Sequence, residues 1–169
     1  MNATRKAVAL LIVSIFVLSL GSVSALAAGT PCVVTVTEES VEKNVSTFGT
    51  TNSLSHPPVT RAVVNLGTDG SRNYSWTISA GETLYSANHY KTESEKFVVR
   101  MLASPSSTSI TVSLYSSGGS LVGSQTVTVG TIFQSKVTFS NLSSAESYYV
   151  KMTNNDQHSA TISGTFAAK

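Results

Sequence analysis

After residue 30, apolar and polar residues alternate with a period of two along most of the chain. This alternation is typical of β-strands that bury one face and expose the other. It predicts strands over residues 33–37, 61–66, 74–78, 83–85, 97–102, 110–115, 126–129, 133–139, 148–153 and 160–166. Beyond the N-terminal apolar run no convincing helix is indicated, and the best candidate, a short segment over residues 38–43, is weak.

Turn-forming residues separate these segments. Gly118 and Gly119 supply the positive φ that a hairpin needs, and Gly130 ends another apolar segment. The polar run 153–158 joins the last two segments in the same way. About eight to ten short strands at regular spacing predict an all-β, jelly-roll-like antiparallel β-sandwich.

The N-terminus has the layout of a cleaved secretory signal. Two basic residues precede an apolar run over residues 7–20, and Ala25-Leu26-Ala27 places small residues where a signal peptidase cuts. The run is about 14 residues long, whereas a helix needs about 20 to span a bilayer, so a retained membrane anchor is the less favoured alternative. We therefore expect a signal peptide over residues 1–27, a bacterial protein secreted from the cell, and no membrane span after cleavage.

Removal of the signal leaves residues 28–169, enough for one domain with its own core. Residues 44–60 are polar and rich in turn formers, which predicts a loop. We divide the remaining chain into an N-terminal strand and loop segment, residues 28–60, and a β-sandwich domain, residues 61–169. The first segment is either part of the sandwich or an appendage to it.

Charge is balanced once the signal is removed. The full chain has 11 basic and 9 acidic residues, and the signal takes away Arg5 and Lys6 but no acid. Without a basic surplus, the sequence argues against a nucleic-acid partner. Roughly a third of residues 28–169 are serine or threonine, which suits the strands and turns of a secreted all-β protein.

Cys32 is the only cysteine, so no internal disulfide can form. Lipid attachment at Cys32 is disfavoured because Pro31 restricts the backbone that a lipoprotein signal peptidase must bind. In an oxidising compartment an odd cysteine stays free or bridges two chains. We expect either an incidental half-buried thiol or an intermolecular disulfide at Cys32 that links a homo-oligomer.

No residue pattern indicates a catalytic or metal site. Serines are plentiful, but there is no Gly-x-Ser-x-Gly elbow, and we expect His56, His89 and His158 to lie on the surface. Residues 154–156 carry oxygen atoms that calcium can use, yet a single carboxylate in a turn is more typical of a plain turn. We predict no enzyme activity, no cofactor and no metal.

The aromatic residues are more informative. Trp76, the only tryptophan, shares the parity of a core strand, while Tyr115 and Tyr149 oppose the main apolar parity of their strands. If those two strands are neighbours, the rings form a flat platform for the apolar C–H faces of sugars. The alternative is that they simply cover the second face of the sheet. We expect four tyrosines to be exposed: Tyr85, Tyr90, Tyr115 and Tyr149.

Roughly residues 95–166 resemble the pre-peptidase C-terminal domains, a family of secreted bacterial β-sandwiches. The resemblance rests on Leu114-Tyr115, Gly118-Gly119, Leu121-Val122, Tyr148-Tyr149-Val150 with Lys151, and a closing hairpin that ends over residues 160–166. It implies a β-sandwich with an accessory, binding-type role. Some members bind calcium through acidic residues before the Leu-Tyr strand. This chain has serine and threonine there, over residues 106–109, so no metal site is implied.

These observations favour a secreted, non-catalytic binding or surface-interaction protein. We expect extracellular polysaccharide or cell-wall material as its partner, contacted by Tyr115 and Tyr149. One alternative is an extracellular structural or matrix protein that self-associates through strand edges or Cys32. A small secreted enzyme or inhibitor is a further alternative.

Overall fold

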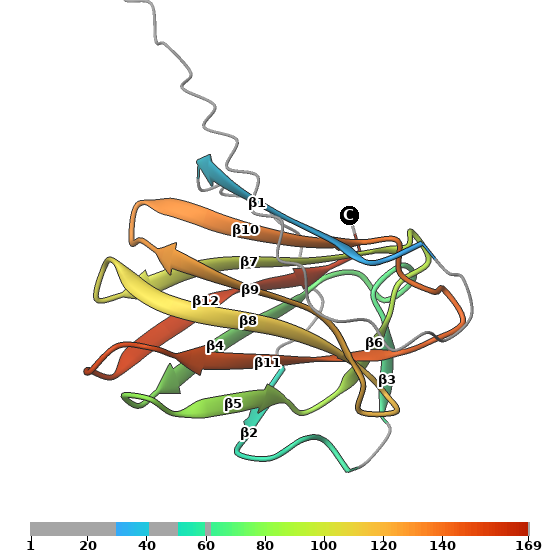
Figure 1. Cartoon of the computed structure of the whole chain (residues 1–169), viewed down its shortest axis with the longest axis horizontal. Coiled ribbons are helices and arrows are strands. Elements are labelled where there is room, and N and C mark those ends of the chain that lie inside the picture. Colours follow the sequence, from blue (N-terminus) through green and yellow to red (C-terminus); the bar gives the residue numbers. More distant parts are fainter. Residues whose placement is uncertain (1–29, 41–50, 60–61, 169) are drawn as a thin grey trace, which may run out of the picture.

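The structure is a computed structural model that describes residues 30–40, 51–59 and 62–168. The expected signal peptide, residues 1–27, lies outside them. The described residues form twelve strands and no helix, which confirms the predicted all-β class with somewhat more strands than expected. The strands form two mostly antiparallel sheets packed face to face, a β-sandwich (Figure 1).

The first sheet contains five strands, in the spatial order β1 (Val33–Ser40), β10 (Phe133–Ser140), β7 (Lys96–Ser104), β12 (Ala160–Ala167) and β4 (Arg72–Ile78). The main strands of the second sheet are β5 (Thr83–Ser86), β11 (Tyr148–Asn154), β8 (Thr108–Ser116) and β9 (Leu121–Val129). Three short strands complete the second sheet at the β5 side: β2 (Ser53–Leu54), β6 (His89–Lys91) and β3 (Val63–Asn65).

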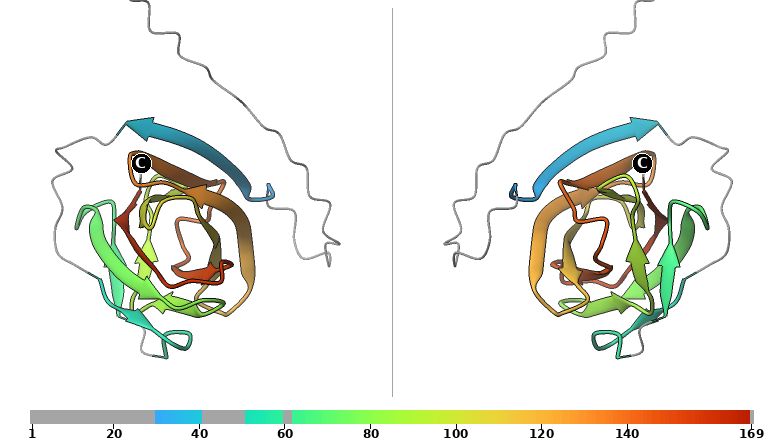
Figure 2. Two further views of the ribbon diagram at one scale, coloured as in Figure 1. Left: turned by 90° about the vertical axis from the view of Figure 1, so that its left-hand side faces the viewer. Right: turned by 90° about the vertical axis from the view of Figure 1, so that its right-hand side faces the viewer.

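Eight of the strands follow jelly-roll order. Strands β4, β12, β7 and β10 lie side by side in one sheet, and β5, β11, β8 and β9 lie side by side in the other. The chain crosses between the sheets at nearly every connection, as in the two Greek keys of a jelly roll. Figure 2 shows the strands wrapped around a single interior, with β1 as the outermost strand.

The structure places strand, and not helix, at the start of the weak helical candidate over residues 38–43. Strand β1 continues through Ser40, and residues 41–43 lie outside the described residues. The Glu39 carboxylate accepts a hydrogen bond from Lys136 Nζ at 2.7 Å and another from Arg100 Nε at 3.3 Å. Pairing with the neighbouring strands therefore overrides a weak local helical preference.

Other boundaries differ because very short strands carry no alternation to detect. Of the described residues 62–66 in the predicted 61–66 strand, only Val63–Asn65 form a strand, which pairs parallel to β6, and Arg61 lies outside the described residues. Strands β2 and β6 were not predicted. Strands β1 and β2 hydrogen-bond into the two sheets, so the described part of residues 28–60 contributes to the sandwich itself.

Aromatic rings fill one end of the core and join the two sheets. The rings of Tyr74 and Phe166 stack with their centroids 4.4 Å apart, and Trp76 packs edge-on against Phe166. From the second sheet, Tyr90 contacts both Phe97 and Phe166. Tyr90 is completely buried, so the expectation that it is exposed was wrong, whereas Trp76 lies in the core as predicted.

Thr51 connects the N-terminal part of the chain to this cluster. Its carbonyl oxygen accepts a hydrogen bond from Trp76 Nε1 at 3.4 Å, and its hydroxyl is 2.7 Å from the Tyr90 hydroxyl. Its backbone amide donates to the carbonyl oxygen of Asn73. These bonds satisfy buried polar groups that would otherwise destabilise the core.

Gly164 allows the Tyr74 ring to pack over the first sheet. A Cβ at position 164 would overlap the Arg100 carbonyl group and lie 3.0 Å from the Tyr74 hydroxyl. That hydroxyl donates to the Arg100 carbonyl oxygen at 2.8 Å. Because the Arg100 carbonyl and the Tyr74 ring come so close to Gly164, a residue with a larger side chain does not fit at this position in the strand.

We predict that Gly164→Ala lowers the free energy of unfolding by about 1–3 kcal/mol, because the methyl group overpacks the strand. Gly118→Ala is the matched control, since its added Cβ would meet only the Ser116 hydroxyl at 3.7 Å. Urea denaturation of both variants measures the difference. Equal stability of Gly164→Ala and the parent protein would contradict the packing described.

We also predict that stability falls as pH rises above about 10. Burial raises the pKa of Tyr90 from 10.0 to about 12. Between these values the unfolded chain loses a proton that the folded protein keeps, so stability drops by up to about 1.4 kcal/mol per pH unit for this group. Denaturation from pH 8 to 11 should show a shallower pH dependence in Tyr90→Phe, and an identical dependence would contradict the assignment.

Candidate functional site

Tyr115 and Tyr149 lie opposite each other on neighbouring strands of the second sheet. Strand β11 pairs antiparallel with β8, and Tyr149 is the cross-strand partner of Tyr115. The adjacent residues Leu114, Tyr148 and Val150 belong to the hydrophobic core. Because side chains alternate along a strand, the two tyrosines face outward from the sandwich.

The two rings stack on each other and do not lie side by side as a flat platform. Their planes are 10° apart and their centroids are 5.3 Å apart. One face of each ring is therefore covered by the other ring, an offset stack that aromatic pairs favour. Tyr149 is only 6 % exposed, whereas Tyr115 remains partly exposed. The expected platform is thus corrected: Tyr149 forms a base and Tyr115 presents a ring to solvent.

Two more aromatic side chains enclose Tyr149. The ring of His89 packs edge-on against it at 5.6 Å, and the partly exposed ring of Tyr85 lies at 6.3 Å. We call Tyr85, His89, Tyr115 and Tyr149 the tyrosine patch. His89 is 2 % exposed, so its expected place on the surface was wrong. The three-residue strand β6 extends the sheet beside β11, and a strand this short shows no alternation in the sequence.

A bulge in β9 places an exposed leucine beside the patch. The register between β8 and β9 shifts after Leu114, so that Tyr115 pairs with Leu121 while Leu114 pairs with Gly123. A Cβ on Gly123 would lie 2.9 Å from Val34 and 3.0 Å from Phe139, so glycine allows β1 and β10 to pack closely there. Bulges of this kind redirect side chains. Leu121, 58 % exposed, consequently extends the apolar surface next to Tyr115.

Hydroxyl groups cover the remainder of this outer face. Across neighbouring strands, three pairs of hydroxyls lie within hydrogen-bond distance: Thr83–Thr153 at 2.8 Å, Thr111–Thr126 at 2.7 Å and Ser113–Ser124 at 2.8 Å. Lys151 pairs with Tyr85 on one side and Ser113 on the other. The outer face of the second sheet thus combines one aromatic patch with many hydrogen-bonding groups.

The buried phenol of the patch, Tyr149, remains uncharged at neutral pH. Burial raises the pKa of Tyr149, and the nearby phenols of Tyr115 and Tyr85 raise it further. The Tyr149 hydroxyl therefore keeps its proton in the pH range of most extracellular fluids. Its hydroxyl can act as both a hydrogen-bond donor and an acceptor.

Cys32 directly precedes β1 and is half-buried. It packs against the core cluster, and burial raises the pKa of its thiol, an effect only partly offset by a backbone hydrogen bond at Ser140. A raised pKa leaves little of the reactive thiolate at neutral pH. This environment suits an inert thiol better than a readily formed bridge.

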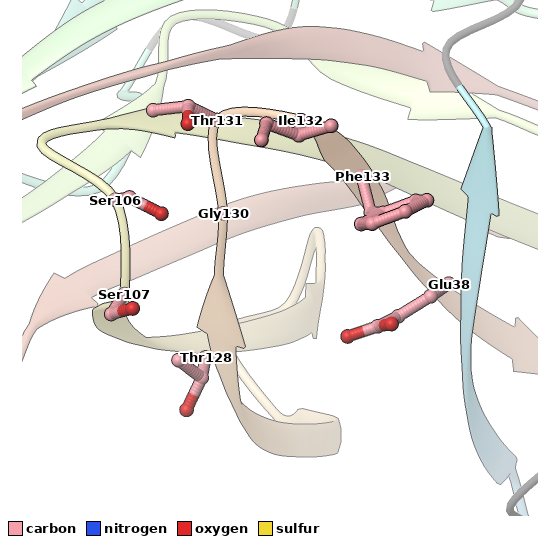
Figure 3. A pocket seen from close by; sticks show the side chains of 8 residues that line it. All are labelled: Glu38, Ser106, Ser107, Thr128, Gly130, Thr131, Ile132 and Phe133. Atoms are coloured by element: carbon pink, nitrogen blue, oxygen red, sulfur yellow. The ribbon is translucent and has the colours of Figure 1, made fainter.

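A concave region lies at the end of the sandwich opposite to the tyrosine patch. It is a pocket of about 240 Å³ between the β7–β8 and β9–β10 loops, lined by Glu38, Ser106, Ser107, Thr128, Gly130, Thr131, Ile132 and Phe133. Figure 3 shows the Phe133 ring and the Glu38 carboxylate on one side, with the serine hydroxyls on the other. Its apolar part consists mainly of exposed Ile132 and Phe133.

The polar turn over residues 154–156 serves to close the sandwich. The Asn154 side-chain amide donates to the carbonyl oxygens of Ile78, Ser79 and His158. The Asp156 carboxylate accepts a hydrogen bond from the Ser109 amide at 2.7 Å and lies 4.0 Å from His158 Nε2. These hydrogen bonds show that residues 154–156 form a turn that stabilises the fold.

Comparison with known proteins gives no further guidance: no protein family, curated protein or solved structure matches the chain. Within the described ranges, no three His, Cys, Asp or Glu side chains group as metal ligands. No helix among those residues has the length and apolar character to cross a membrane.

We predict a double-mutant coupling between Tyr115 and Tyr149. Tyr149→Ala should lower the free energy of unfolding by about 3–5 kcal/mol, because it empties a buried ring site. Tyr115→Ala should lower the free energy of unfolding by less than Tyr149→Ala does, since the Tyr115 ring is partly exposed. The coupling free energy should be about 0.5–1.5 kcal/mol for a stacked pair. Additive effects in urea denaturation would contradict the stacking.

Proposed function

We propose that the protein is a secreted, non-catalytic binding protein whose tyrosine patch binds extracellular polysaccharide or cell-wall material. The observation that carries the proposal is the partly exposed Tyr115 ring, stacked on buried Tyr149 and flanked by exposed Leu121. Ligand sites typically combine apolar and aromatic surface with a few polar groups that fix orientation.

Sugars match this surface chemically. A pyranose ring has an apolar face of C–H groups and a rim of hydroxyls. The free face of the Tyr115 ring and Leu121 suit the apolar face, and Lys151 with the serine and threonine hydroxyls suits the rim. Buried Tyr149 supports the Tyr115 ring in one orientation, which reduces the entropy lost on binding.

Two further considerations support a binding role. The resemblance of residues 95–166 to pre-peptidase C-terminal domains implies an accessory domain of this type. Jelly rolls also occur in lectin domains, which is an analogy of fold and not of function. The layout of residues 1–27 supports secretion and therefore contact with such material.

The test is retention of the protein, purified after expression of the full chain, on insoluble polysaccharides and isolated cell walls. We predict that the parent protein is retained on at least one of them and that Tyr85→Ala with Tyr115→Ala abolishes retention. This pair removes the partly exposed rings and leaves buried Tyr149 in place, so the fold should survive. Circular dichroism checks that the double variant is folded.

Phe133→Ala is the matched control, because it removes an exposed aromatic ring at the other end of the sandwich. It should bind as the parent does. The proposal fails if the parent binds none of the materials, or if Phe133→Ala loses retention as completely as the patch variant.

A further inference from the structure

Strand β1 forms one edge of the first sheet. Its eight residues pair with β10 in one continuous register, from Val33 opposite Ser140 to Ser40 opposite Phe133. Within the described part of the chain, no strand pairs with its other side. Figure 2 shows β1 on the outside of the sandwich, beyond β10. One row of its backbone amide and carbonyl groups therefore has no sheet partner among these residues.

Over Val33–Thr37, the edge strand itself lacks the residues that normally prevent pairing. Exposed edge strands are usually short, or interrupted by proline, lysine or a bulge. Strand β1 has none of these, and its first five residues, Val33–Thr37, are uncharged and all β-branched. Val33 and Val36 are 47 % and 42 % exposed. Such a segment has a high intrinsic tendency to pair with another strand.

We propose that two copies of the chain pair antiparallel through β1, about a two-fold axis at Val36. This pairing joins the two first sheets into one continuous sheet across the dimer. A two-fold axis lets the same surface serve both partners, which is the commonest symmetry of homo-oligomers. The inference does not depend on the proposed glycan site, which lies on the second sheet.

The register follows from the position of Val36 near the middle of β1. With the axis at Val36, residues 32–40 of one copy lie opposite residues 40–32 of the other, so the whole strand is used. Val36 then meets Val36 of the second copy, and both exposed side chains become covered. A shift of the axis by several residues toward either end would leave part of β1 without a partner strand.

Threonine pairs support the same register. Thr35 of each copy lies opposite Thr37 of the other, and cross-strand threonine pairs stabilise antiparallel sheets. The sandwich already uses such pairs between its own strands, with hydroxyls at hydrogen-bond distance: Thr77–Thr161, Thr83–Thr153 and Thr111–Thr126. The proposed interface repeats a contact that the fold uses elsewhere.

Charge is also compatible with this register. Glu38 lies opposite Val34 of the second copy and Glu39 opposite Val33, so the acids of the two copies are not opposed. Within its own chain, Glu39 forms ion pairs with Lys136 at 2.7 Å and Arg100 at 3.3 Å. These pairs hold β1 against the sheet and neutralise the charge of Glu39.

The proposed dimer does not involve a disulfide. Each Cys32 lies opposite Ser40 of the other copy, which separates the two cysteines by about 27 Å at 3.4 Å per residue. A Cys32–Cys32 bridge is incompatible with that separation. The dimer should therefore persist in a reducing agent and in Cys32→Ser, unlike an oligomer linked through Cys32.

Analytical ultracentrifugation across a dilution series tests the association. The parent protein and Cys32→Ser should show a monomer–dimer equilibrium with the same dissociation constant. Val36→Lys places two like charges at the axis and should weaken the dimer at least about tenfold. Val59→Lys, at a residue that is 83 % exposed and distant from β1 in sequence, is the matched control and should leave the constant unchanged. A protein that is monomeric at every concentration overturns the proposal, as does a dimer that disappears in Cys32→Ser.

Cysteine cross-linking tests the register. In a Cys32→Ser background, Val36→Cys should form a disulfide-linked dimer on mild oxidation, because directly opposite residues have Cα atoms about 4.5–5.5 Å apart. Thr37→Cys should not, because diagonal neighbours lie about 7–8 Å apart. Efficient cross-linking through Thr37→Cys, or none through Val36→Cys, overturns the register.

Discussion

The cluster of aromatic rings at one end of the core is the interaction on which the rest of the structure depends. The chain has a single cysteine, so no disulfide within it can hold the two sheets together. Tyr74 and Phe166 stack within the first sheet, and Tyr90 brings the second sheet onto them. Rings of this size each bury a large apolar area, which makes them the main source of stability where burial alone must hold a fold. Thr51 ties the N-terminal segment to the same cluster.

Side chains alternate between the two faces of a strand, so the residues that fill the core determine which neighbouring residues lie on the outer face of the sheet. Tyr148 and Val150 face the core, so Tyr149 between them must face outward. The pairing of β11 with β8 then brings Tyr115 onto Tyr149. The proposed binding surface is a consequence of this arrangement, whereas the edge of β1 that has no strand partner among the described residues belongs to the first sheet. They lie on different sheets, so the protein can in principle bind a polymer and pair with a second copy at the same time.

The fold class and most strands could be predicted from the sequence, because the alternation of apolar and polar residues is a local signal. The sequence also showed that Tyr115 and Tyr149 oppose the core parity of their strands. It did not show that their rings stack, because ring orientation depends on His89 and Tyr85 from other strands. The predicted exposure of Tyr90 and His89 was wrong, because both lie on a three-residue strand that is too short to show an alternating pattern. The weak helical pattern that begins at residue 38 gives way to strand over residues 38–40, because Glu39 pairs with Lys136 and Arg100 from distant parts of the chain.

The most direct test of the central claim is to map binding by NMR on the labelled protein. A panel of soluble oligosaccharides from cellulose, xylan, chitin and peptidoglycan serves as the probe. The account predicts that at least one of them shifts backbone amide signals grouped around Tyr115, Tyr149 and Leu121, with the signals of Phe133 and its neighbours unchanged. Shifts confined to the pocket beside Phe133, or no shifts with any probe, would contradict the assignment of the tyrosine patch as the binding surface.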